Sequence, residues 1–157
     1  MTALQVYRDD GPLARWAARK LGAADEHPLA WIIPPLVRAA EYGYVLALTA
    51  FSEPDALPVC FAFLAVLAFH HYDTVYRLRQ QQSVPPTWVR AVGGGWEGRI
   101  VVISALALAG VLQVGLLVAT VVLALVYVTE STLSWIRYGR GDPAPAHEDE
   151  NEIENAE

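Results

Sequence analysis

The stretch IVVISALALAGVLQVGLLVATVVLALVYV, residues 100–128, decides the fold, because 29 consecutive residues carry no charged side chain. The apolar character continues to Ile136, which makes a block of 37 residues. One straight helix of that length would measure roughly 55 Å, whereas the hydrocarbon core of a bilayer is about 30 Å thick. The block therefore predicts two membrane-spanning helices, over about 97–111 and 116–137. We expect the break at GVLQVG, 110–115, where glycine allows a tight turn and Gln113 can hydrogen-bond the freed backbone.

Two further apolar blocks precede this one. The first runs from about Leu29 to Phe51 and is interrupted only by Arg38 and Glu41. The second runs from Leu57 to about Tyr76 and opens with LPVCFAFLAVLAF. The fold class predicted from these blocks is all-α, an integral membrane bundle of about four transmembrane helices in a domain spanning 29–137.

The flanks of this domain differ from it in composition. Residues 1–28 are predicted to form a cytoplasmic segment with an amphipathic helix over PLARWAARKLG, 12–22, which either lies in the membrane interface or packs on the domain. Residues 138–157 form an acidic tail that we expect to be disordered. Seven acids of this tail account for the net charge of −6, since the remaining 10 acids face 11 Lys and Arg.

Basic residues are distributed unevenly over the connecting segments. The N-terminal segment, the long loop 77–99 and the flank after residue 136 all carry arginines, whereas the turns 52–56 and 110–115 carry neither Lys nor Arg. Cytoplasmic segments carry an excess of Lys and Arg. Four spans place every basic segment inside, so we expect a multi-pass protein of the plasma membrane with both termini cytoplasmic.

Ionisable side chains within the apolar blocks are costly in a bilayer and each suggests a function. Arg38 and Glu41 lie three residues apart and are predicted to pair on one helix face. A second group lies toward the inner ends of the second and last helices: His70, Asp73, Arg77 and Glu130. Spacings of three and four residues predict that His70, Asp73 and Arg77 share one helix face. Arg38 is expected to approach this group at a similar depth.

Two interpretations of this group stay open. In one, the charges neutralise one another and determine helix packing. In the other, they line a polar pocket for a charged headgroup, an ion or a proton. The catalytic candidates are then His70, as a general base oriented by Asp73, together with Glu130. No metal site is predicted, because the adjacent His70 and His71 point about 100° apart on a helix.

The segment GGGWEGR, 93–99, suggests phosphate binding at the membrane surface. Gly94 and Gly95 would let backbone N–H groups approach an anion at the start of a helix, and arginines would add charge-assisted contacts. The segment lacks the Lys-Ser/Thr of a P-loop, and the alternative is a flexible turn with Trp96 at the interface. The predicted headgroup-binding arginines are Arg38, Arg77, Arg79, Arg90 and Arg99.

Three motifs carry a resemblance to a known family: FHHYDTVYRLRQ (69–80), PPTWV (85–89) and GGGWEGR (93–99). Together they resemble an uncharacterised actinobacterial membrane domain, over about residues 28–137. In that family the domain often follows a nucleotidyltransferase-like region and a CDP-alcohol phosphotransferase region. The chain itself lacks the D-x-x-D-G-x-x-A-R pattern of those phosphotransferases, so the resemblance implies a role beside such an enzyme.

The function predicted on this basis is a membrane-embedded accessory or binding module for a phosphate-bearing lipid or headgroup. Its partners would be membrane lipid, a CDP-alcohol phosphotransferase-type enzyme and, in a homo-oligomer, further copies of the chain. The alternatives are a membrane enzyme that uses His70 and Asp73 as an acid–base pair, and a small proton-coupled transporter. No cofactor is assigned, and no nucleic-acid partner is predicted because the basic residues are explained by topology.

Overall fold

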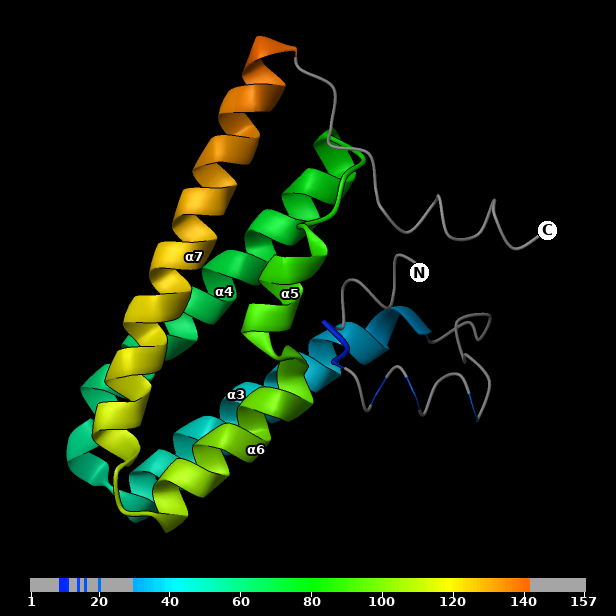
Figure 1. Ribbon diagram of the computed structural model, residues 1–157. Helices are drawn as coiled ribbons and strands as arrows, with labels where there is room; N and C mark the ends of the chain where they lie inside the picture. The colour runs from blue at the N-terminus through cyan, green and yellow to red at the C-terminus, as the bar shows by residue number, and fades with distance from the viewer. Residues whose placement is uncertain (1–8, 12–13, 15, 17–19, 21–29, 142–157) are drawn as a thin grey trace.

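The computed structural model of the protein describes residues 9–11, 14, 16, 20 and 30–141, and every regular element within 30–141 is helical (Figure 1). The predicted all-α class is therefore confirmed. The elements in chain order are η2 (Ala30–Ile32), α3 (Ile33–Ser52), η3 (Pro54–Ala56), α4 (Leu57–Gln80), α5 (Thr87–Gly93), α6 (Gly95–Leu108) and α7 (Leu112–Arg140).

The four long helices form two antiparallel hairpins that lie against each other. The first hairpin is α3 and α4 and the second is α6 and α7, and contacts join α3 to α6 and α4 to α7. In Figure 1 the α3–α6 pair and the α4–α7 pair meet at the lower end and diverge toward the upper end, where α5 lies between them. The bundle is thus closed at the turns and open at the end that receives α5.

The second hairpin turns earlier than the sequence predicted. The break lies at residues 109–111, where Gly110 has a φ of 68°. Gly115, predicted to belong to the break, lies inside α7, where an added Cβ would stand 2.4 Å from a methyl carbon of Leu106. Close approach of α6 to α7 therefore explains this second glycine better than a turn does.

A carboxylate from the first hairpin satisfies the start of α7. The N–H groups of Leu112 and Gln113 donate to the two carboxylate oxygens of Glu53, each at 3.0 Å. The first N–H groups of a helix have no partner within it and favour negative charge. The sequence predicted that the side chain of Gln113 would hydrogen-bond the freed backbone N–H groups. Glu53 of the other turn accepts these hydrogen bonds instead, so one side chain joins both hairpin turns.

The segment 77–99 is more helical than predicted. Helix α4 continues to Gln80, α5 occupies Thr87–Gly93 and α6 begins directly at Gly95. The predicted break at Pro85 and Pro86 is confirmed, since both precede α5 and follow α4. Arg77 and Arg79 lie in the last turn of α4, where positive charge is favourable, and this helps the helix to extend past its predicted end.

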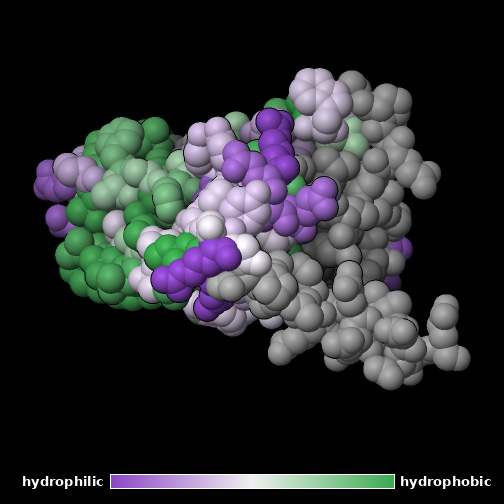
Figure 2. Space-filling view, turned by 90° about the horizontal axis from the view of Figure 1, so that it is seen from above, coloured by the Kyte–Doolittle hydropathy of each residue, from purple (hydrophilic) through white to green (hydrophobic). Residues whose placement is uncertain are grey.

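Within the described residues, three helical segments are long and apolar enough to cross a membrane: Pro54–Gln80, Thr87–Leu108 and Leu112–Arg140. Helix α3 has 20 residues but includes Arg38 and Glu41, so the count of four spans stays a prediction. Figure 2 shows hydrophobic side chains gathered over one side of the molecule. Large apolar residues are exposed along α6 and α7, among them Val101, Leu108, Val114, Leu117, Val118, Val121 and Leu125.

The core lies where α4 meets the other helices. Its fully buried members include Phe63 and Leu67 of α4, with Val45 of α3 and Leu116 of α7 against them. The predicted amphipathic helix 12–22 falls mostly outside the described residues, as does the tail 142–157. Helix α7 continues to Arg140, three residues past its predicted end.

We predict that Glu53→Ala lowers the stability of the protein in detergent by about 1–2 kcal/mol, because it removes the partner of two helix N-terminal N–H groups. Equilibrium unfolding followed by circular dichroism measures this change. Asp55→Asn is the matched control, since Asp55 is exposed in the same turn and should leave stability within about 0.5 kcal/mol. Equal stability of the two variants would contradict the prediction.

Candidate functional site

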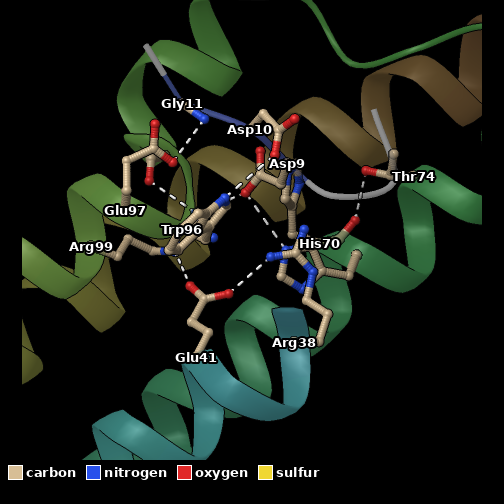
Figure 3. A network of polar contacts seen from close by, with 12 residues as sticks. Asp9, Asp10, Gly11, Arg38, Glu41, His70, Thr74, Trp96, Glu97 and Arg99 are labelled. Atoms are coloured by element: carbon tan, nitrogen blue, oxygen red, sulfur yellow. Dashed lines mark hydrogen bonds and ion pairs between the residues drawn. The ribbon is translucent and has the colours of Figure 1, made fainter. Parts of the chain in front are cut away.

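Arg99 lies at the centre of a buried network of charges at the open end of the bundle (Figure 3). Its Nε donates to a carboxylate oxygen of Glu41 at 2.6 Å. Its Nη1 donates to a carboxylate oxygen of Asp9 at 2.8 Å and to the carbonyl of Gly93 at 3.0 Å. The side chain is 5% exposed, so two carboxylates from distant parts of the chain neutralise one buried guanidinium.

Glu41 extends the network to a second arginine. The Nη1 of Arg38 donates to its other carboxylate oxygen at 2.8 Å, and the pair predicted from the three-residue spacing is therefore confirmed. Glu41 is 1% exposed and lies between Arg38 and Arg99. Buried carboxylates require such partners, and here they come from α3 itself and from α6.

Asp9 belongs to an N-terminal segment that crosses the first turn of α6. The N–H of Trp96 donates to the carbonyl of Asp9 at 3.3 Å. The N–H groups of Gly11 and Ala14 donate to the carboxylate of Glu97 at 3.0 and 3.1 Å. We call the described residues 9–11 and 14 the N-terminal strap. Glu97 and Trp96 hold its backbone, and Arg99 holds the side chain of Asp9.

The strap explains one of the two glycines that the sequence assigned to phosphate, Gly95. An added Cβ on Gly95 would lie 2.5 Å from both N and Cα of Gly11, so only glycine permits this approach. Gly94 and Gly95 have φ values of 71° and 69°, in the left-handed region that favours glycine. The acidic strap therefore packs on the start of α6. This contact was not predicted from the sequence, and the adjacent acids Asp9 and Asp10 are the feature that could have indicated it.

One histidine of α4, His71, also contacts the strap. The Nε2 of His71 lies 3.6 Å from the carboxylate of Asp9, and its Nδ1 lies 2.8 Å from the hydroxyl of Tyr42. Burial opposes ionisation of Asp9, but its contact with His71 and the positive charge of Arg99 outweigh burial, so the pKa of Asp9 lies well below its usual value. Asp9 is therefore ionised at neutral pH.

A second charged cluster joins α4 to α7. Arg77, 1% exposed, binds both carboxylate oxygens of Glu130 at 2.7 and 2.8 Å, and its Nε lies 2.8 Å from a carboxylate oxygen of Asp73. The other oxygen of Asp73 accepts hydrogen bonds from Ser131 and Trp135, both at 2.8 Å. The shared face predicted for Asp73 and Arg77 is confirmed.

This arrangement bears on the predicted His70–Asp73 pair. Both side chains face α7 but contact different residues of it. Asp73 accepts from Ser131 and Trp135, whereas the ring of His70 stacks on Tyr127 with centroids 3.9 Å apart. The histidine–carboxylate contact seen within the described chain is the one between His71 and Asp9. The catalytic role of His70, Asp73 and Glu130 stays a prediction, but their contacts are those of packing and charge neutralisation.

A cavity of about 450 Å³ lies between the first turns of α3, the last turns of α4 and α5. We call it the arginine-lined cavity. Its charged and titratable lining residues are Asp9, Arg38, His70, His71, Arg79 and Arg90, and its apolar walls include Trp31, Pro34, Pro35, Val75 and Pro85.

The cavity divides the five arginines predicted to bind a headgroup. Arg38, Arg79 and Arg90 line it, whereas Arg77 and Arg99 each lie against two carboxylates in the charged clusters. Guanidinium groups bind phosphate through paired N–H donors. Arg79 and Arg90 thus face a space of ligand size, and Arg38 faces it while it also pairs with Glu41 in the Arg99 network.

A second hollow, of about 540 Å³, lies between α6 and α7 and is almost entirely apolar. We call it the apolar groove. Gly98 and Ala119 leave room in its walls, and one end reaches Gly93 and Arg99. Helix α5 contributes to both hollows, with Arg90 lining the first and Val92 the second. The arginine-lined cavity and the apolar groove thus both border the same short helix.

These features define an all-helical protein with three helices that could cross a membrane and a charged network at one end of the bundle. The chain belongs to the DUF5941 family, a family of unknown function whose profile matches residues 13–154. The predicted membership in an uncharacterised family is confirmed. No curated protein and no solved structure was found to match the chain.

We predict that Arg77→Gln destabilises the protein by about 3–5 kcal/mol, because it removes the positive partner of the buried Asp73 and the partly buried Glu130. Arg79→Gln is the matched control two residues away, on an exposed side chain. Equilibrium unfolding in detergent compares the two variants. A loss for Arg77→Gln no larger than that for Arg79→Gln would contradict a structural role for this cluster.

We predict that Asp9→Asn lowers the melting temperature in a pH-dependent way. Because the pKa of Asp9 is lowered by folding, its ionised form stabilises the protein above the usual aspartate pKa, about 3.9, and this contribution is lost as the pH falls toward the lower pKa. The difference in melting temperature between wild type and variant should be constant above about pH 5 and shrink below pH 4. A difference that is the same at pH 3 and pH 7 would exclude this linkage.

Proposed function

We propose that this protein is a membrane-embedded binding module whose arginine-lined cavity holds the phosphate of a lipid headgroup. The observation that carries the proposal is the division of the arginines. Arg77 and Arg99 each lie between two carboxylates, while Arg38, Arg79 and Arg90 share one cavity. Among the described residues that line the cavity, Asp9 is the acidic one, so positive charge predominates there.

The charged network supports a position of α3 within the membrane. Arg38 and Arg99 together carry two positive charges, and Glu41 and Asp9 carry two negative charges. Each of these side chains contacts an opposite charge at 2.6–2.8 Å. Ionisable groups within a bilayer are tolerated when they face the bundle and pair with one another. In the proposed topology α3, α4, α6 and α7 all cross the membrane.

The positions of the basic residues orient this topology. The two hairpin turns, 53–56 and 109–111, lie at one end of the bundle and carry no Lys or Arg. The ends of α4, α5 and α7 carry arginines at the other end. By the positive-inside rule both termini are cytoplasmic and the cavity faces the inner leaflet of the plasma membrane. Exposed Trp31 and Trp88 suit the lipid–water interface.

A lipid is favoured over a soluble phosphate compound by the apolar groove beside α5. Headgroup binding at this face suits an accessory role beside an enzyme that transfers phosphate-bearing headgroups, of the CDP-alcohol phosphotransferase type. An acid–base enzyme is the second candidate. The observation that favours it is His71, which lines the cavity and lies between the hydroxyl of Tyr42 and the carboxylate of Asp9.

We predict that Arg90→Gln weakens binding of dioleoyl phosphatidic acid roughly tenfold, since a hydrogen-bonded charge pair contributes about 1.5–3 kcal/mol. Purified protein in phosphatidylcholine nanodiscs is titrated with the labelled lipid. Arg137→Gln, on the exposed end of α7, is the control and should bind as the wild type does.

Two further ligands identify what is recognised. Dioleoylglycerol lacks the phosphate and should not compete, whereas soluble glycerol 3-phosphate should compete only at much higher concentration. Equal binding by Arg90→Gln and wild type would contradict the proposed site. Competition by glycerol 3-phosphate at the concentration of the lipid would show that the ligand is a free phosphate ester.

The four-span topology predicts which residues face the cytoplasm. In a Cys60→Ser background, Lys20→Cys and Gly139→Cys should react with a membrane-impermeant maleimide only after the membrane is permeabilised, while Asp55→Cys should react in intact cells. Labelling of Lys20→Cys from outside would mean that α3 does not cross the membrane and that three spans are present.

A further inference from the structure

Asp9 stands between the arginine-lined cavity and Arg99. It is one of the residues that line the cavity, and its carboxylate lies 2.8 Å from the Nη1 of Arg99. Arg99 does not belong to that lining and is 5% exposed. Figure 3 shows Asp9 reaching from the strap into the network. A ligand in the cavity would therefore meet the carboxylate before it could reach Arg99.

The groups around this carboxylate would also suit a phosphate. Arg99 donates to it, and the Nε2 of His71 lies 3.6 Å away. Phosphate and carboxylate oxygens accept from the same charged donors. The strap thus places a side-chain anion of this chain in a site whose donors would serve the anion of a ligand.

Within the described residues, the strap is held by three residues of α6. Arg99 binds the side chain of Asp9, and the N–H of Trp96 donates to the carbonyl of Asp9. Glu97 binds the N–H groups of Gly11 and Ala14 independently of Asp9. Release of the Asp9 side chain from Arg99 therefore leaves the backbone attachments at Trp96 and Glu97 in place.

We propose that Asp9 is a displaceable internal ligand, which the phosphate of the bound lipid replaces beside Arg99. This inference rests on the proposed function and names how its site is regulated. A phosphate monoester carries about −1.5 to −2 charge at pH 7, against −1 for the carboxylate. Displacement adds Arg99 to Arg38, Arg79 and Arg90, so four arginines face the ligand in place of three.

The test is the affinity of Asp9→Asn for dioleoyl phosphatidic acid, measured with the full chain in phosphatidylcholine nanodiscs. Asparagine keeps the shape of the side chain and removes the competing charge, so we expect binding about tenfold tighter than that of the wild type. Asp10→Asn is the matched control. Asp10 accepts from the indole N–H of Trp96 at 3.4 Å and is not among the residues that line the cavity, so this variant should bind as the wild type does.

A second variant displaces the strap without changing any charge. In Gly95→Ala the added Cβ would lie 2.5 Å from the backbone of Gly11, which pushes the strap off the start of α6. Gly94→Ala carries the same backbone strain, with a φ of 71° against 69°, but its Cβ would meet only the Cα of Gly98 at 4.0 Å. We expect Gly95→Ala to bind the lipid more tightly than Gly94→Ala, with circular dichroism confirming that both are folded.

The outcomes separate this inference from the function on which it rests. Tighter binding by Asp9→Asn and by Gly95→Ala supports a displaceable Asp9. Unchanged or weaker binding by both, with wild-type binding that still depends on Arg90, would mean that Asp9 only holds the structure together and would overturn the inference alone. If the wild type does not bind phosphatidic acid, the proposed function and the inference both fail.

Discussion

A single guanidinium, that of Arg99, organises the open end of this bundle. A buried charge is costly unless it is paired and hydrogen-bonded, and Arg99 meets Glu41 from α3 and Asp9 from the strap. Because Arg99 and its two partners come from three separate segments, neutralising the charge also determines where α3, α6 and the N-terminal strap lie relative to one another. At the opposite end Glu53 plays a comparable part, joining the first turn to the start of α7.

Both charged clusters hold helices together. Arg77 lies between Asp73 and Glu130 and joins α4 to α7, in the same way that Arg99 joins α6 to α3. The strap then closes the space beside α5 on one side. What remains is a cavity in which arginines predominate, at the end of the molecule that carries most of the basic residues. The proposed function follows from Arg38, Arg79 and Arg90, which line that cavity together.

Much of this arrangement could be predicted because it depends on local patterns. Long apolar blocks indicated the helices. The spacing of three residues indicated the Arg38–Glu41 pair, and the spacing of four placed Asp73 and Arg77 on one helix face. Hairpin positions were predicted to within a few residues. One prediction failed because a distant residue took over a local task, as Glu53 did for Gln113. The contact of the strap with Gly95 likewise depends on residues far apart in the sequence.

The sequence by itself determined that the protein is helical, how its apolar segments divide and which side chains carry charge, because composition and periodicity set these properties within each segment. Only the tertiary structure decided which arginines lie between two carboxylates and which line a cavity. Asp9 and Arg99 are 90 residues apart, and no periodic pattern links residues at that separation. Their pairing follows from the crossing of the strap over the first turn of α6, which becomes possible only once the helices have packed.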